Sequence, residues 1–102
     1  MASLLVLYKK PNDAAAFDKY YFEKHIPLAK KIPGLKTYTV TQGPIMTPAG
    51  PSPLHLIATL EFADMAAIQQ AFASPEGQAT AADLQNFATG GADMIMADTK
   101  AV

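Results

Sequence analysis

The stretch Leu54–Phe62 has the sequence LHLIATLEF, in which apolar residues recur at every second position. On a β-strand, alternate side chains point to opposite faces, so one face would be wholly apolar: Leu54, Leu56, Ala58, Leu60 and Phe62. The other face would carry His55, Ile57, Thr59 and Glu61. This period predicts a strand with its apolar face on the core.

A helical pattern follows this strand toward the carboxyl terminus. Asp64 can cap a helix whose apolar residues recur at helical spacing, namely Met65, Ile68 and Phe72. Ser74–Glu76 favours the start of a second helical stretch that runs to about Phe87, because serine caps helices and proline fits their first turn. Gly90-Gly91 ends that stretch, and Asp93–Thr99 predicts a last strand.

The amino-terminal half has the same order of strand, helix and strand. Ser3–Lys10 (SLLVLYKK) predicts a strand that is covered on both faces. A helical pattern begins at Ala14 and ends at Pro33-Gly34, and Leu35–Gln42 (LKTYTVTQ) predicts the next strand. Gly43–Pro53 contains four prolines and two glycines, which predicts a long, semi-rigid loop.

These elements predict an α+β fold with a single domain over residues 1–102, namely a ferredoxin-like βαββαβ sandwich with a four-stranded antiparallel sheet. Two helices would cover one face of the sheet. The strands also carry apolar side chains on the other face, such as Leu5 and Leu7. We therefore expect a homodimer in which a second sheet covers that face, rather than a monomer with an exposed apolar face.

Composition argues against several classes of partner. Eight basic and nine acidic residues give a net charge of −1, so nucleic acid is not expected. The absence of cysteine removes disulfides, thiolate catalysis and cysteine metal sites, and fits a cytoplasmic protein. The apolar run in MASLLVLYKK is too short for a signal peptide or a membrane span, so no membrane partner is expected.

The helix beginning at Ala14 contains the most informative residue, His25. One helical face would carry Phe17, Tyr21, Lys24, His25 and Leu28. Pro27 lacks an N–H and disfavours helical geometry at Ile26, which predicts a bend at about His25–Pro27. The imidazole would then stand at a gap between this helix and the sheet, one turn from Tyr21.

This position predicts a site for proton transfer on an apolar, oxygenated small molecule. Imidazole has an unperturbed pKa near neutrality, so His25 is the candidate acid or base, and Tyr21 could donate to a developing oxyanion. The candidate substrate-binding residues are Tyr8, Phe17, Leu28 and Phe87, and the loop Gly43–Pro53 could cover the pocket mouth. The alternative is that His25 is an ordinary core residue whose nitrogens are satisfied by the protein.

Other chemistries find less support. His25 and His55 lack a metal-ligand spacing, and no glycine-rich loop matches a nucleotide-binding pattern, so neither metal nor cofactor is expected. Asp83 and Asn86 could fix the turn into the last strand, or Asn86 could reach the pocket; we favour the structural role. His55 could share the pocket or lie on the subunit-facing side of the sheet, and we favour the latter.

Three stretches together resemble the EthD-like family, named for a protein linked to ethyl tert-butyl ether degradation. They are LLVLYKKP, YYFEKHIPLAKKIPGLKTY and HLIATLEFADMAAIQQAFASPEGQATAADLQNFATGG. The resemblance implies a dimeric α/β barrel, an activity often labelled oxidoreductase, and His25 and Tyr21 as the matching site residues. Fungal relatives are associated with dehydration or decarboxylation of aromatic polyketides.

Two functions follow from these observations. The first is a small cofactor-free enzyme that uses proton transfer in a dehydration, decarboxylation, isomerisation or oxidation. The second is a non-catalytic protein that binds a hydrophobic ligand or supports a degradation pathway.

Overall fold

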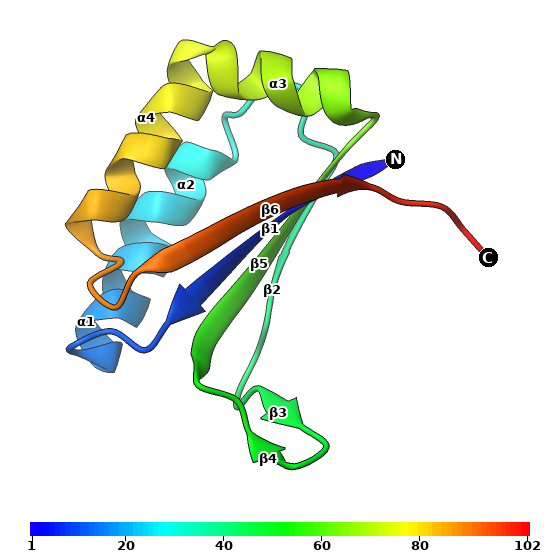
Figure 1. The fold of residues 1–102 in the computed structure, drawn as a ribbon. Helices are drawn as coiled ribbons and strands as arrows, with labels where there is room; N and C mark the ends of the chain where they lie inside the picture. Colours follow the sequence, from blue (N-terminus) through cyan, green and yellow to red (C-terminus); the bar gives the residue numbers. More distant parts are fainter.

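Helices cover only one face of a four-stranded antiparallel sheet in the computed structural model, which describes residues 1–102 (Figure 1). The strands are β1 (Ala2–Lys9), β2 (Thr37–Val40), β5 (Leu54–Phe62) and β6 (Ala92–Asp98), in the spatial order β2-β5-β1-β6. This order and the βαββαβ sequence of elements confirm the ferredoxin-like fold.

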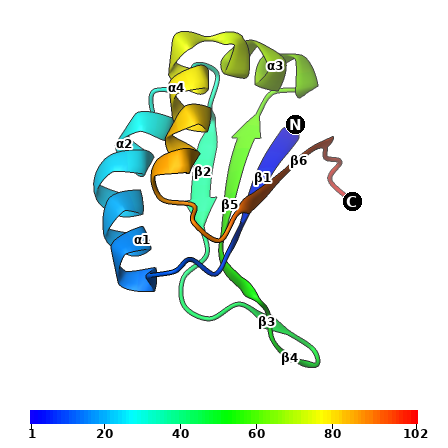
Figure 2. The same cartoon turned by 60° about the vertical axis from the view of Figure 1, so that its left-hand side comes forward.

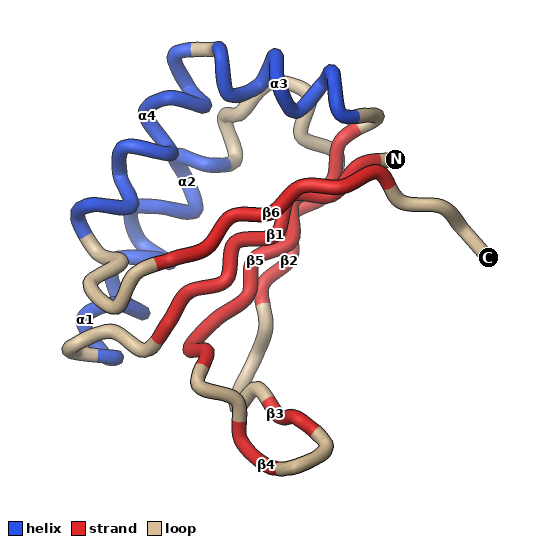
Figure 3. The backbone as a smooth tube through the Cα atoms, viewed as in Figure 1, coloured by secondary structure: helices blue, strands red, loops and turns tan.

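The proline-rich segment departs from the prediction of a plain loop. It folds into a two-stranded hairpin, β3 (Met46–Thr47) and β4 (Gly50–Pro51), that projects beyond the end of the main sheet (Figure 3). Proline is tolerated there because these very short strands have only one ladder of hydrogen bonds between them.

The helical layer begins with α1 (Ala14–Tyr20), which continues through a π-helical turn, η1 (Tyr21–His25), into α2 (Ile26–Ala29). The second half contributes α3 (Met65–Ala73), α4 (Pro75–Asp83) and a short 3₁₀ turn, η2 (Leu84–Asn86). The predicted caps form: Asp64 accepts from the Ala67 N–H and Ser74 accepts from the Gly77 N–H. No helix is long and apolar enough to span a bilayer.

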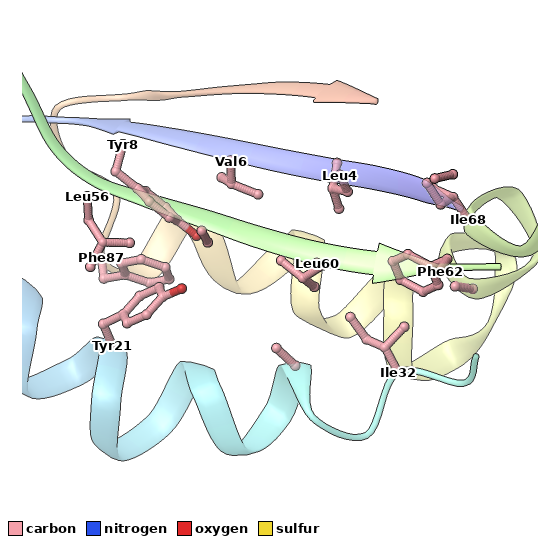
Figure 4. Close-up of a cluster of buried hydrophobic side chains, with 14 of the residues drawn as sticks. Leu4, Val6, Tyr8, Tyr21, Ile32, Leu56, Leu60, Phe62, Ile68 and Phe87 are labelled. Carbon is pink, nitrogen blue, oxygen red and sulfur yellow. The ribbon is translucent and has the colours of Figure 1, made fainter. Parts of the chain in front are cut away.

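The strand register decides which side chains form the core. Leu4, Val6 and Tyr8 of β1 pair with Leu60, Ala58 and Leu56 of β5, and all six are buried beneath the helices (Figure 4). The helices lie on one side of the sheet (Figure 2), so the opposite face, with Leu5, Leu7 and Ile57, has no helix over it. The predicted two-faced strands therefore leave an apolar face uncovered in the single chain.

The irregularity near Pro27 is a π turn, and Ile26 remains helical. Ile26 has φ −59° and ψ −47°, which corrects the prediction that proline pushes it out of helical geometry. Its N–H donates to the Tyr21 carbonyl, five residues earlier, so the turn holds one extra residue. This widening aligns Phe17, Tyr21, His25 and Ala29 on the buried face, and leaves Leu28 beside that face.

Candidate active site around His25

The imidazole of His25 is buried between the sheet and α4. Only 3% of the residue is exposed, and its ring packs against Phe87 at a centroid distance of 4.6 Å and against Tyr21 at 5.3 Å. Nδ1 lies 2.9 Å from Oδ2 of Asp83, in the last turn of α4. The π turn thus brings the histidine of one helix onto a carboxylate of another.

Three donors converge on the Asp83 carboxylate. Besides the His25 ring, the Tyr20 hydroxyl donates to Oδ1 over 2.7 Å and the Asn86 amide donates to the same atom over 2.8 Å. Burial alone would raise the pKa of the Asp83 carboxyl, but these hydrogen bonds together lower the pKa below its ordinary value. Asp83 is therefore a carboxylate at neutral pH.

The histidine beside it is held in its neutral form. Burial lowers the pKa of His25, and the hydrogen bond and charge of Asp83 only partly offset that effect. A carboxylate can only accept, so Nδ1 must carry the ring proton and Nε2 must hold a lone pair. No protein group bonds Nε2. Since no fully buried side-chain nitrogen of the chain lacks a partner, this basic nitrogen is both free and open to solvent.

Three phenols gather near His25, on β1, β2 and η1. The hydroxyls of Tyr21 and Tyr38 are 2.6 Å apart, and the Tyr8 hydroxyl lies near that of Tyr21. Figure 4 shows the rings of Tyr8 and Tyr21 beside Phe87. Burial raises the pKa of all three phenols, so they remain hydrogen-bond donors.

These polar groups border a narrow cavity, the His25 cavity. It has a volume of about 20 Å³, which accommodates roughly one water molecule. Its polar lining includes His25 and the phenols of Tyr8, Tyr21 and Tyr38, and the rest is mainly apolar. Two of the lining residues, Ala81 on α4 and Met94 on β6, are exposed, so the cavity meets the surface between these elements.

The structure brings some of the predicted site residues together at the cavity and leaves others outside it. His25, Tyr21 and Tyr8 line the cavity. Phe17 and Phe87 pack behind the rings instead, and Leu28 is displaced because the π turn gives its expected place to Ala29. The proline-rich hairpin does not border this cavity, so it does not cover the mouth.

Sequence reasoning missed three contributors, Asp83, Tyr20 and Tyr38. An acidic residue in the last turn of a helix opposes the helix dipole, so the position of Asp83 was a usable signal for a specific partner. Asn86 does not line the cavity, and its amide bonds the Asp83 carboxylate. Asp83, which we expected to fix the turn into the last strand, bonds His25 instead. Tyr20 and Tyr38 carried no comparable signal.

His55 was predicted on the outer face of the sheet, and this prediction is wrong. Tyr8 pairs with Leu56 and Lys9 pairs with Leu54, so His55 is the extra residue of a β-bulge. Its ring contacts α1, where Nε2 lies 2.8 Å from Oδ1 of Asp18. His55 and His25 therefore occupy separate places on the helix side of the sheet.

Residues 9–91 match the family model of the EthD domain. This chain belongs to the EthD family. A Rhodococcus erythropolis relative, described as an uncharacterized 11.0 kDa protein in the thcB-thcC intergenic region, is 41% identical over 102 residues, which are 100% of this chain and 98% of that protein. The crystal structure of an EthD family protein from Bacillus halodurans is 35% identical, with a TM-score of 0.89 over 98% of this chain and 99% of that chain.

More distant structures share the fold of this EthD chain. SnoaB, a cofactor-independent oxygenase from Streptomyces nogalater, is 13% identical, with a TM-score of 0.69 over 99% of this chain and 94% of that chain. A dimeric protein of unknown function and ferredoxin-like fold from Bacteroides fragilis is 17% identical, with a TM-score of 0.66 over 96% of this chain and 95% of that chain. At these identities the likeness is one of fold.

Proposed function

We propose that this EthD-family protein is a cofactor-free enzyme that removes a proton from an apolar, oxygenated small molecule at the His25 cavity. The observation that carries the proposal is the unpaired Nε2 of a neutral, buried histidine whose other nitrogen is fixed by Asp83. A base of this kind needs a pKa near or below the working pH and a lone pair aimed at the substrate. The lowered pKa of His25 meets the first condition, and its free Nε2, on a residue that lines the cavity, supports the second.

Nε2 takes a proton from an acidic C–H or O–H group, and the electron pair left behind moves onto the substrate oxygen. The Tyr8 hydroxyl, whose proton is given to no protein group, donates to this developing oxyanion. Asp83 stabilises the imidazolium that forms, as its hydrogen bond with Nδ1 becomes an ion pair.

The reaction that follows the first proton transfer depends on the substrate. An enolate or phenolate can lose water or carbon dioxide, can be reprotonated elsewhere, or can react with oxygen. The likeness in fold to a cofactor-independent oxygenase supports the view that this scaffold can work without a cofactor. Oxidoreductase activity and a link to ether degradation remain predictions from the family resemblance, and cytoplasmic location remains a prediction from the absence of cysteine.

Substrate entry requires the cavity to widen, because about 20 Å³ does not hold an organic molecule. The gap between β6 and α4 is the natural route, since Met94 is 40% exposed and β6 is an edge strand. A methionine side chain changes rotamer readily, so Met94 can open the gap without unfolding a helix.

The proposed working form is a homodimer. Leu5, Leu7 and Ile57 are half-buried on the helix-free face of the sheet, and Ile95 is 55% exposed on the same face. A second copy of this face would remove these side chains from water and leave the helix side free. The dimeric neighbour of the same fold supports this assembly.

The mainly apolar lining of the cavity also supports a second candidate, a non-catalytic protein that binds a hydrophobic ligand or supports a degradation enzyme. The test is turnover of a panel of phenolic, enolisable and ether compounds, under air and under nitrogen, by the wild type, His25→Gln and Lys24→Gln. Lys24 is the exposed neighbour of His25 and serves as the matched control. We expect His25→Gln to lose about 10²–10⁴-fold in rate while it remains folded.

Two results would overturn the enzyme assignment. One is undiminished turnover by a folded His25→Gln variant. The other is saturable binding of panel compounds by the wild type with no turnover of any, which would establish the binding protein instead.

A further inference from the structure

A second, larger hollow lies between the helical layer and the proline-rich hairpin; we call it the His55 groove. It has a volume of about 710 Å³, within the range of small-molecule sites. One wall comes from Asp18 of α1 and Phe22 of η1, the other from residues 40–45 and 51–52, and His55 lies among the residues that line it. Leu56 is the one buried core residue in its lining. The groove and the His25 cavity have no lining residue in common.

The backbone places His55 in this groove by a specific device. The bulge opposite Lys9 turns the side chain away from the outer face and onto α1. The ring then packs edge-on against Phe17 at a centroid distance of 4.8 Å, and its Nε2 bonds Asp18 over 2.8 Å. The imidazole is only 19% exposed and is fixed on two sides.

Fixing the ring in this way determines what its other nitrogen can do. Nε2 donates to the Asp18 carboxylate, so in the neutral ring Nδ1 holds a lone pair and accepts a hydrogen bond. No protein group donates to it. A ligand hydroxyl is the simplest donor to this nitrogen, whereas a ligand anion there would be repelled by Asp18.

Two other polar side chains in the groove have no partner in the chain. The Lys10 ammonium and the Gln42 amide make no hydrogen bond or ion pair, although both border the groove. By contrast, the Thr41 and Ser52 hydroxyls already accept from backbone N–H groups. Lys10 therefore supplies the one uncompensated positive charge of the lining.

An aromatic surface and rigid walls complete the groove. Phe22 is 52% exposed and offers an aromatic surface to the groove. Pro44 and Pro51 lie in the opposite wall, where their fixed φ angles limit the loss of entropy on binding.

We propose that the His55 groove is a binding site for a hydroxylated aromatic carboxylate. The ring would lie on Phe22, the hydroxyl would donate to Nδ1 of His55, and the carboxylate would lie toward Lys10 and Gln42, away from Asp18. This orientation follows from the charges of the lining. The site is separate from the His25 cavity and does not depend on the function proposed for it.

The test is an NMR titration of the full-length protein with 4-hydroxybenzoate. Benzoate lacks the hydroxyl and 4-hydroxybenzyl alcohol lacks the charge, so the pair separates the two polar contacts. We expect saturable shifts at Phe22, Gln42 and His55, the same shifts in His25→Gln, and weaker binding of both analogues. Lys10→Gln should weaken 4-hydroxybenzoate about two- to five-fold, as for an exposed ion pair, while the control Lys36→Gln should not.

His55→Phe tests the hydroxyl contact while it keeps an aromatic ring against Phe17. We expect this variant to bind 4-hydroxybenzoate about two- to ten-fold more weakly than the wild type does. Its affinities for 4-hydroxybenzoate and benzoate should then be equal. The proposal is overturned if binding does not saturate by about 10 mM, if the shifts fall on the His25 cavity, or if folded Lys10→Gln and His55→Phe bind as the wild type does.

Discussion

Replacement of Asp83 by asparagine tests the central element of the candidate active site. The two side chains have the same shape, but the amide offers one acceptor oxygen and an NH₂ donor in place of two acceptor oxygens. His25, Tyr20 and Asn86 all direct donors at the carboxylate. The amide cannot satisfy all three, and we expect His25 to move its proton from Nδ1 to Nε2, so that Nδ1 accepts from the new NH₂ group.

The loss of stability can be worked from the same contacts. Hydrogen bonds to a charged group contribute about 1.5–3 kcal/mol each and neutral ones about 0.5–1.5 kcal/mol, so weakening all three by about 0.5–1 kcal/mol each loses about 1.5–3 kcal/mol in total. The Asp83 side chain is only 10% exposed, so solvent screens these bonds little. With an unfolding entropy of about 2 cal/mol/K per residue over 102 residues, this lowers the Tm by about 7–14 °C.

The assay is a long-range ¹H–¹⁵N spectrum of the histidine rings at pH 7, combined with thermal melts. The wild type should show His25 protonated on Nδ1 alone, and Asp83→Asn should show Nε2 protonated. Asn86→Ala is the control, because it removes an exposed donor and keeps the carboxylate, so the tautomer should not change. A wild-type ring that carries its proton on Nε2, or is doubly protonated, would refute the reasoning.

Three further predictions concern entry, pH and assembly. Met94→Ala should widen the gap between β6 and α4 and tighten the binding of apolar phenols to the His25 cavity, measured by titration calorimetry; unchanged affinity would mean that ligands do not enter there. Burial lowers the pKa of His25 in the folded state, so the unfolded state takes up the proton at a higher pH. The free energy of unfolding should therefore fall as the pH drops below about 6.5, the ordinary pKa of histidine. In thermal melts from pH 8 to 5, His25→Gln should show a smaller loss of stability than the wild type. Leu7→Arg should convert a dimer into a monomer by light scattering, since it adds a charge to the helix-free face of the sheet; a monomeric wild type would contradict the assembly.

The fold could be predicted from the sequence because its signals are local and agree with one another. The alternation in Leu54–Phe62 decides the strand and its buried face, and the caps at Asp64 and Ser74 decide where the helices begin. The site could be predicted only in part. Asp83 meets His25 across 58 residues of chain, and no local pattern encodes that contact.

The two errors of position have one physical cause, which also bears on function. The π turn at Tyr21–His25 and the bulge at His55 each insert one residue into a regular element. After such an insertion, the side chains lie on a different face from the one that the regular period predicts. Leu28 and His55 were misplaced for this reason. Both insertions carry a histidine, and each of these histidines lies within 2.9 Å of an aspartate on another element.

A regular helix and a regular strand would have been easier to form, since each irregularity disrupts its hydrogen-bond ladder. The surrounding contacts must therefore favour the irregular forms, and at both places these contacts include the histidine–aspartate pair itself. Core packing alone does not require either pair, because an apolar side chain of similar volume would fill the same space without a buried polar group to satisfy. The coincidence of irregular backbone and paired histidine at two separate places is thus better explained by binding or chemistry at both than by packing at either.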